Sequence, residues 1–495
     1  MWQARDMGDL SGRSVPTAGT GVRLSGIRLR ALPVWLLPAA VTLVVTLAGL
    51  DAAQPWRDEL ATWSAATRGV GGLLRLAGTI DAATGPYYLF MYAWLTVAGD
   101  TVAALRLPSA LAMAAAAGLT AVLGQRLWDA RIGTLAGLLL AVLPGTSRYG
   151  QEARPYALAT ALAVLSTLLL VEALRRPGWG RWVAYSAATT ALGLTHLIAL
   201  TLLAAHAVVV LCRAARLRPL RWWLLALVPV ALVLTPLVLL ARSQRARQLD
   251  WVDTARLGDL ATLPGGLAQS AAVGGLLVAL AVLGAGRLGR RAVLPGACVL
   301  LPVLLLFVVG LAVPLWVPRY LVFVMPFGCL LAGAALASAR LAAALVVIIL
   351  AGLLGLPDQI ALRRTHEWPR TATVDYRGAA QIIAAGQRPG DAVVYAPRDS
   401  WLFLDLGLRY HLGERAPRDA LLAEEQQQRG DLWAVECDRP ADCLAGVDRV
   451  WLVVGGRQSD PLAAVPGPKG DALRTSYTVD GTWLRPGLTV TLLTR

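Results

Sequence analysis

Two short polar stretches of this apolar chain combine carboxylates with arginines. The first holds the adjacent acids Asp58 and Glu59, shortly after a long apolar run, and the second holds Arg148, Glu152 and Arg154. A carboxylate can take a proton from an acceptor hydroxyl, and arginine binds phosphate through two parallel hydrogen bonds. Together the stretches suit an anionic lipid-linked substrate, although each one alone could be an ordinary solvated loop or a membrane anchor.

Two further candidates lie within or beside apolar runs. His196 interrupts such a run, where an ionisable residue is a functional candidate. The alternative is a buried neutral histidine that bonds to a backbone carbonyl. Arg319 and Tyr320 begin another run, and this arginine could hold the phosphate of a lipid carrier or only contact lipid headgroups.

The elements that must position these residues are membrane helices. Of the 495 residues, 56% are hydrophobic, and several runs approach the roughly 20 apolar residues that cross a bilayer. These runs are apolar on all sides, whereas a core helix of a soluble protein is amphipathic. We predict about eleven spans, at 33–50, 104–124, 132–148, 156–174, 182–194, 195–212, 222–241, 270–286, 293–313, 318–338 and 341–356.

The arginines orient these spans. They carry almost all of the net charge of +15, since Lys469 is the only lysine. The positive-inside rule places the basic loops in the cytoplasm together with the tail of residues 1–30. These loops contain Arg126, Arg131, Arg175, Arg176, Arg181, Arg213, Arg216, Arg218, Arg221, Arg287, Arg290 and Arg291. The loop 51–103, the turn at 148–154 and the C-terminal region then face outward. Because the membrane accounts for the charge, we expect a multi-pass plasma-membrane protein with no nucleic-acid partner.

Two segments depart from simple spans. Pro86–Ala98 is apolar and aromatic but too short to cross a bilayer easily, and as a span it would invert every later loop. We predict that it lies flat at the outer interface, where Tyr and Trp are favoured. Residues 182–212 are long for one helix and short for two, so we predict a tight hairpin with His196 at its outer turn.

The predicted fold class is an all-α polytopic membrane domain over 31–356 with a small extracytoplasmic α/β domain over 365–495. Asp375 is the expected N-cap of a helix that reaches Gln387. Strands are expected at 391–396, 450–455 and 488–493. Cys437 and Cys443 have no His or Cys nearby at zinc-ligand spacing, so we predict a local disulfide in an oxidising compartment, with two free thiols as the alternative.

Six stretches follow one another along the chain: Asp58-Glu59, Thr84-Gly-Pro-Tyr-Tyr-Leu-Phe, Arg106-Leu-Pro-Ser-Ala-Leu, Tyr149-Gly-Gln-Glu-Ala-Arg-Pro-Tyr-Ala-Leu, Thr195-His196 and Arg319-Tyr-Leu. In this order they resemble the motifs of the GT-C superfamily of membrane glycosyltransferases. Within that superfamily they resemble bacterial relatives of protein O-mannosyltransferases and of the lipid A aminoarabinose transferase. Thr84-Gly85 replaces the usual His-Pro of the family, so a family histidine near the acceptor or metal is missing. The C-terminal region resembles that of actinobacterial members more loosely.

The resemblance implies an inverting transfer of a sugar, mannose by default, from a polyprenyl-phosphate donor to a protein, lipid or cell-wall glycan acceptor. Asp58 would be the general base. Glu59 and Glu152 would position the acceptor or hold a divalent cation such as Mg²⁺ or Mn²⁺, and Arg154 and Arg319 would stabilise the leaving phosphate. The expected substrate-binding set is Glu59, Arg148, Glu152, Arg154, His196, Arg319 and Tyr320. A transporter, which tends to carry inverted repeats and midplane charges, and a catalytically inactive assembly partner are the alternatives.

Overall fold

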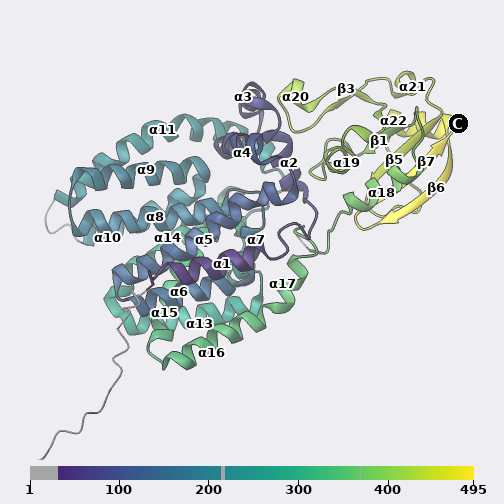
Figure 1. Ribbon diagram of the computed structural model, residues 1–495. Helices are drawn as coiled ribbons and strands as arrows, with labels where there is room; N and C mark the ends of the chain where they lie inside the picture. The colour runs from purple at the N-terminus through teal and green to yellow at the C-terminus, as the bar shows by residue number, and fades with distance from the viewer. Residues whose placement is uncertain (1–31, 213–217, 368–369) are drawn as a thin grey trace, which may run out of the picture. The chain divides into compact units, whose positions relative to one another are not determined.

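The computed structural model describes residues 32–212, 218–367 and 370–495 (Figure 1). The predicted tail of residues 1–30 and the loop arginines Arg213 and Arg216 lie outside these ranges. Val34–Arg495 forms one compact unit, and the elements described below belong to it.

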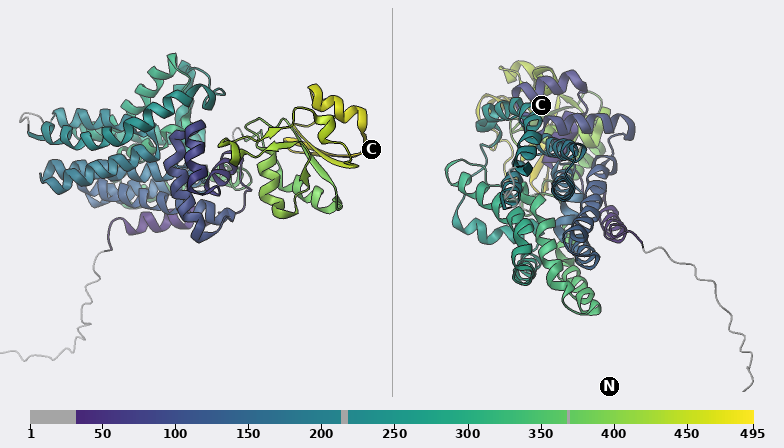
Figure 2. Two further views of the ribbon diagram at one scale, coloured as in Figure 1. Left: turned by 90° about the horizontal axis from the view of Figure 1, so that it is seen from above. Right: turned by 90° about the vertical axis from the view of Figure 1, so that its left-hand side faces the viewer.

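Long apolar helices make up the first part of the chain. Among the described residues, five helical stretches are long and apolar enough to cross a membrane, or up to seven if each of two bent pairs is one span. In the right-hand view of Figure 2 many of these helices are seen nearly end-on, side by side. The five stretches are α5 (Val102–Leu127), α8 (Tyr156–Arg175), most of α11 (Arg218–Gln248), Ala271–Ala312 and Pro318–Ala337.

Two of the five stretches contain more than one element. Ala271–Ala312 comprises α13 (Ala271–Leu288), the 3₁₀ turn η3 (Gly289–Ala292) and α14 (Val293–Ala312). Pro318–Ala337 comprises η4 (Pro318–Val324) and α15 (Met325–Ala337). Each predicted span in these regions overlaps its helix within a few residues.

The first of the two bent pairs falls within one predicted span, 132–148, whereas the second begins in the predicted span 341–356 and continues beyond it. In the first pair, α6 (Ala130–Val142) meets α7 (Pro144–Gly150) at 69°. Pro144 has no backbone N–H and is suited to the first turn of a new helix, so the predicted span 132–148 is broken there. In the second pair, α16 (Leu341–Leu354) meets α17 (Leu356–Leu362) at 45°.

Several predicted spans coincide with shorter helices. The segment 33–50 contains α1 (Leu36–Leu47), and 182–212 contains α9 (Trp179–Thr195), η2 (Leu197–Thr201) and α10 (Leu202–Cys212). His196 lies at the break between α9 and η2, with extended backbone angles, as the hairpin prediction requires. Because these helices are short, the count of eleven spans stays a prediction.

Small residues bring the long helices close together. A Cβ atom on Gly133 of α6 would lie 2.1 Å from the carbonyl oxygen of Ala121 in α5. A Cβ atom on Gly284 of α13 would lie 1.8 Å from the carbonyl oxygen of Leu331 in α15. Helices pack in this way in membranes because lipid provides no hydrophobic drive between them and close van der Waals contact replaces it.

The predicted outer loop 51–103 is helical. It forms α2 (Arg57–Ala66), α3 (Gly69–Thr79), the short turn η1 (Ala82–Thr84) and α4 (Gly85–Ala98). Helix α4 covers the segment predicted to lie flat at the interface, and that orientation stays a prediction. A further helix, α12 (Leu257–Ala268), precedes α13.

The C-terminal region folds around a five-stranded mixed sheet in the order β2-β1-β5-β7-β6. Strand β1 pairs in parallel with β2 and β5, whereas β7 is antiparallel to β5 and β6. The strands are β1 (Ala392–Ala396), β2 (Arg418–Asp419), β5 (Arg449–Gly455), β6 (Thr478–Arg485) and β7 (Leu488–Thr494), with β3 (Leu422–Glu424) and β4 (Val435–Glu436) in a separate pair. The helices are α18 (Tyr376–Gly386), α19 (Leu404–Leu412), η5 (Gly413–Arg415), α20 (Gln426–Arg429), α21 (Pro440–Cys443) and α22 (Gly467–Ser476).

The local predictions for this region are confirmed. The Asp375 carboxylate accepts a hydrogen bond of 2.8 Å from the backbone N–H of Gly378 and caps α18. Cys437 and Cys443 form a disulfide. The three predicted strands are β1, β5 and β7, whereas β2, β3, β4 and β6 were not predicted.

The C-terminal region packs against the helices of the segment 51–103. Leu60 of α2 and Tyr88 of α4 share one buried cluster with Tyr376, Leu404 and Trp451. This shared core holds the C-terminal region over the end of the helical part where Asp58 lies.

Candidate active site

Asp58 lies in the first turn of α2, where a negative charge is favoured by the partial positive charge of a helix N-terminus. The next residue, Glu59, accepts a hydrogen bond of 3.3 Å from the backbone N–H of Trp56, which fixes the start of the helix. Asp58 then faces away from Glu59 and pairs with Arg319, with 3.3 Å between the carboxylate and the guanidinium.

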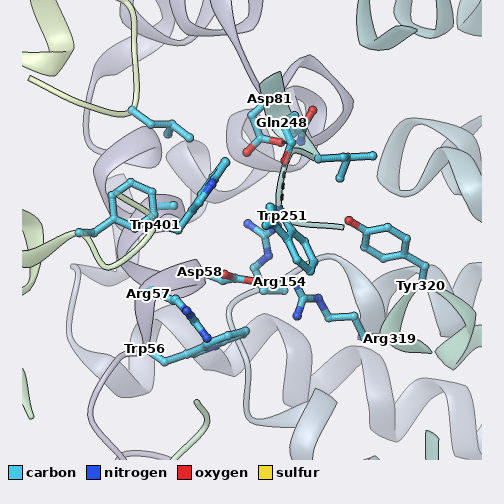
Figure 3. Close-up of a pocket in the computed structure, with 14 residues that line it drawn as sticks. Trp56, Arg57, Asp58, Asp81, Arg154, Gln248, Trp251, Arg319, Tyr320 and Trp401 are labelled. Atoms are coloured by element: carbon cyan, nitrogen blue, oxygen red, sulfur yellow. Dashed lines mark hydrogen bonds and ion pairs between the residues drawn. The ribbon is translucent and has the colours of Figure 1, made fainter. Parts of the chain in front are cut away.

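Asp58 and Arg319 line a cavity of about 310 Å³ between the helical part and the C-terminal region. Figure 3 shows them with Arg154 near the centre of this first cavity, with Trp56 on one side and Asp81 and Gln248 on the other. The lining residues are Trp56, Arg57, Asp58, Ala61, Asp81, Arg154, Gln248, Leu249, Trp251, Arg319, Tyr320, Trp401, Phe403 and Leu432.

Arg319 is held as a fixed cation in this cavity. Its Nε donates a hydrogen bond of 3.1 Å to the hydroxyl of Tyr156. Its guanidinium carbon lies 5.7 Å from the ring centre of Trp56 and 5.2 Å from that of Trp251. Cation–π contacts of this kind orient an arginine without neutralising its charge.

Arg154 is another cation of the first cavity. It donates hydrogen bonds of 3.3 Å to the hydroxyl of Tyr88 and 3.5 Å to that of Thr62. Both acceptors are neutral, so much of its charge remains available to an anion in the cavity.

A second cavity of about 500 Å³ adjoins the first. Arg154, Gln248, Leu249 and Tyr320 line both. The remaining lining residues of the second cavity are Ala83, Thr84, Pro155, Tyr156, Thr195, His196, Leu197, Ile198, Ala241, Arg242, Arg245, Val309, Val313 and Leu315. This set combines three arginines, no carboxylate and many apolar side chains, which suits an anionic group attached to an apolar one.

Four other charged residues form a buried layer behind the first cavity. Glu59 accepts two hydrogen bonds from Arg106, of 2.8 and 2.6 Å, and one of 2.9 Å from the backbone N–H of Ala153. Arg148 pairs with Glu152 at 3.0 Å, and its guanidinium carbon lies 4.9 Å from the ring centre of Trp56. We call Glu59, Arg106, Arg148 and Glu152 the buried charge layer.

Arg106 has a structural role within this layer. Besides Glu59 it donates hydrogen bonds to the backbone carbonyls of Leu50, Ala53 and Gln54. Its side chain and that of Glu59 are each 1% exposed. The pair therefore fastens the chain between α1 and α2 and, through Ala153, the turn before α8.

No protein-family model and no curated protein matches the chain. Among solved structures, ArnT from Cupriavidus metallidurans in the apo state aligns over 92% of this chain and 97% of its own, with a TM-score of 0.60 and 15% identity. ArnT bound to undecaprenyl phosphate aligns equally well, with a TM-score of 0.60 and 16% identity. The chain therefore shares the fold of ArnT. An oligosaccharyltransferase of Archaeoglobus fulgidus is less similar, with a TM-score of 0.47 and 12% identity over 90% of this chain and 71% of its own.

Within this fold the predicted site residues divide into two groups. Asp58, Arg154, Arg319 and Tyr320 line the first cavity, and His196 lines the second. The predicted substrate-binding residues Glu59, Arg148 and Glu152 line neither cavity, because they belong to the buried charge layer; Arg148 reaches only a small pocket of about 30 Å³ beside Arg319.

The residues expected to hold the predicted divalent cation already contact arginines. Both oxygens of Glu59 already accept hydrogen bonds from Arg106, and Glu152 pairs with Arg148. The described residues contain no group of three or more His, Cys, Asp or Glu side chains that could hold a metal ion. A cation at Glu59 and Glu152 stays a prediction, and no step below depends on it.

Several lining residues of the two cavities were not predicted. Arg242 and Arg245 had a usable signal, since they follow the span 222–241 at the face predicted to be outer, where the positive-inside rule does not explain arginines. Asp81 and Trp251 come from short connecting segments without a motif. Trp401 comes from the C-terminal region, and the sequence does not indicate which loop of that region faces the helices.

Proposed function

We propose that this protein is a glycosyltransferase that moves a sugar from a polyprenyl-phosphate carrier to an acceptor hydroxyl at the outer face of the membrane. The observation that carries the proposal is the pair of adjoining cavities. One contains a carboxylate beside a fixed arginine, and the other is apolar with three arginines and no carboxylate. ArnT, whose fold the chain shares, has been crystallised with undecaprenyl phosphate.

The second cavity would hold the carrier. Its apolar walls suit isoprene units, while Arg154, Arg242 and Arg245 suit the phosphate. His196 lies among aromatic rings, with ring centres 5.7 Å from Tyr156 and 5.5 Å from Tyr320. Because Arg154 and Tyr320 line both cavities, a sugar attached to this phosphate would project into the first cavity.

The reaction would be a single displacement. The Asp58 carboxylate takes the proton of the acceptor hydroxyl as that oxygen attacks the anomeric carbon. The bond from the anomeric carbon to the phosphate oxygen breaks, and the carrier leaves as polyprenyl phosphate. Arg154 and Arg319 stabilise the charge that develops on this phosphate, which is the largest electrostatic demand of the step. A single displacement inverts the anomeric configuration.

The test is a transfer assay with the purified full-length protein in lipid nanodiscs. The donors are polyprenyl-phosphate sugars, mannose first and then arabinose, galactose and other pentoses. The acceptors are a peptide, a lipid and a cell-wall glycan. We expect one donor and acceptor pair to release polyprenyl phosphate, and NMR of the product to show inversion.

Asp58→Asn separates an enzyme from a transporter or an inactive assembly partner. As a general base, Asp58 contributes about 100- to 10,000-fold to the rate, so we expect a loss of that size with an unchanged melting temperature. Asp51→Asn is the matched control, because Asp51 is an exposed carboxylate outside both cavities. Full transfer by the Asp58 variant would overturn the assignment, and no transfer by the wild type from any donor would overturn the function.

A further inference from the structure

Asp81 is a carboxylate of the first cavity that has no task in the proposed reaction. It lines the cavity and is 6% exposed, in the connection between α3 and η1. Its φ of 59° lies in the left-handed region, which costs energy for any residue with a Cβ atom, although Asp tolerates it better than most. The surrounding contacts must therefore hold the residue in place.

Those contacts are numerous and come from three elements. The hydroxyl of Thr84 donates a hydrogen bond of 2.7 Å to Oδ1 of Asp81. The side-chain amide of Gln248 also donates to Oδ1, and the hydroxyl of Tyr88 donates to Oδ2. In addition, the backbone N–H of the next residue, Ala82, donates a hydrogen bond of 2.9 Å to the side-chain oxygen of Gln244. Strained residues that are fixed this firmly cluster at functional sites.

The hydrogen bonds leave Asp81 with spare capacity. An ionised carboxylate can accept about four hydrogen bonds. In the described part of the chain three side-chain donors reach it, two at Oδ1 and one at Oδ2. One acceptor position therefore remains on Oδ2 of a group that borders the cavity. The nearby cation Arg154 bonds to the Tyr88 hydroxyl, so a ligand hydroxyl is the natural donor for this position.

The location of Asp81 indicates which ligand carries that hydroxyl. Gln248, which donates to Asp81, lines both cavities together with Arg154. Asp81 thus lies where the two cavities join, next to the point where a sugar leaves its carrier phosphate. We propose that Asp81 binds a hydroxyl of the transferred sugar and so selects the donor; this inference rests on the proposed function.

The experiment measures kcat/KM for the preferred lipid-linked sugar and for its single-deoxy analogues. We expect the wild type to discriminate against one deoxy analogue by about 10- to 100-fold, because a buried polar group left unpaired is costly. Asp81→Asn should lower kcat/KM for the full sugar and remove that discrimination, while the other deoxy analogues keep their ranking. If Asp81→Asn does not fold, the same measurement is made with Asp81→Glu, which retains the charge but displaces the carboxylate.

Asp100→Asn is the matched control. Asp100 lies in the same outer segment and accepts a hydrogen bond from the indole of Trp63, outside both cavities. An equal loss for every donor in the Asp81 variant would show that Asp81 only holds its loop, and altered discrimination among acceptor analogues instead would assign it to the acceptor. Either result overturns the inference while the function stands. Absence of transfer by the wild type would overturn the function itself.

Discussion

Asp58 and Glu59 are neighbours in the sequence, and each pairs with an arginine, but the two ion pairs lie in different surroundings. Asp58 and Arg319 are 19% and 16% exposed and border the first cavity. Glu59 and Arg106 are each 1% exposed and lie in the buried charge layer. Because successive residues of a helix point about 100° apart, the first turn of α2 directs Asp58 to the cavity and Glu59 to the buried charge layer.

The difference lies in what each pair can still do. Glu59 receives four hydrogen bonds, from Arg106 twice, from Ala153 and from Trp56, and has no capacity for a substrate. Asp58 has one ion pair at 3.3 Å and faces an open volume. The cavity is therefore suited to reaction, and the buried layer is suited to holding the cavity in shape.

The largest effect is expected from breaking the buried pair. Arg106→Met leaves the Glu59 carboxylate buried without its cation, which typically costs about 3–5 kcal/mol. We expect a large fall in the apparent melting temperature and a poor yield of monodisperse protein. The double variant Arg106→Met with Glu59→Met should recover only the part of the loss that comes from the unpaired charge, because the backbone groups that Arg106 and Glu59 bond remain without partners. A stable Arg106 variant that no longer transfers sugar would instead place the pair in the chemistry.

An intermediate effect is expected at the second cavity. Replacing Arg242 and Arg245 by Gln removes two phosphate donors, and we expect the affinity for undecaprenyl phosphate to fall about tenfold, which is about 1.4 kcal/mol. Their side chains are exposed, so the melting temperature should not change. The affinity is measured by titrating undecaprenyl phosphate into the protein and following its intrinsic tryptophan fluorescence.

Arg290 and Arg291 provide the matched control. They are also exposed, lie outside both cavities, and their replacement by Gln removes the same charge. An equal loss of affinity in both double variants would attribute the effect to the overall charge of the protein and would remove the support for a carrier site at Arg242 and Arg245.

The fold could be predicted from the sequence where the solvent dictates the pattern. A bilayer requires long apolar helices, which is why α5, α8 and α11 lie close to their predicted spans. Strand β6 was missed because it lies at the edge of the sheet, is largely exposed, and contains Asp480 and Gly481, residues that are depleted in strands. Pro144 indicated a helix break, but the span 132–148 was predicted from the length of its apolar run.

The site could be predicted only in part. Asp58, Arg154 and Arg319 stand in motifs, and the structure brings them to one cavity. The same motifs contain Glu59 and Glu152, and sequence alone does not separate them because the direction of a side chain depends on packing. The position of the Asp81 carboxylate depends on its left-handed backbone and on a hydrogen bond from Gln248, which is 167 positions away. Neither feature produces a local sequence pattern.

The smallest effect concerns a carboxyl group between the two regions. Glu367, which precedes the C-terminal region, pairs with Arg57 at 3.2 Å and is 3% exposed. Burial raises its pKa from the ordinary 4.5 to about 7, although the positive charge of Arg57 acts to lower it. The folded state thus favours the protonated form, so this stabilisation is present below about pH 4.5 and is lost as the pH rises through 7. Burial raises the pKa of Glu152 to about 7 as well.

We therefore expect the apparent melting temperature to fall between pH 5 and pH 8, and Glu367→Gln to reduce that fall by about 2 °C. Glu152 remains in this variant, so the slope should lessen and not disappear. Glu414→Gln removes an exposed carboxylate from the C-terminal region and should leave the slope unchanged. A pH curve for the Glu367 variant that runs parallel to that of the wild type would show that the ionisation of Glu367 beside Arg57 does not contribute to this pH dependence.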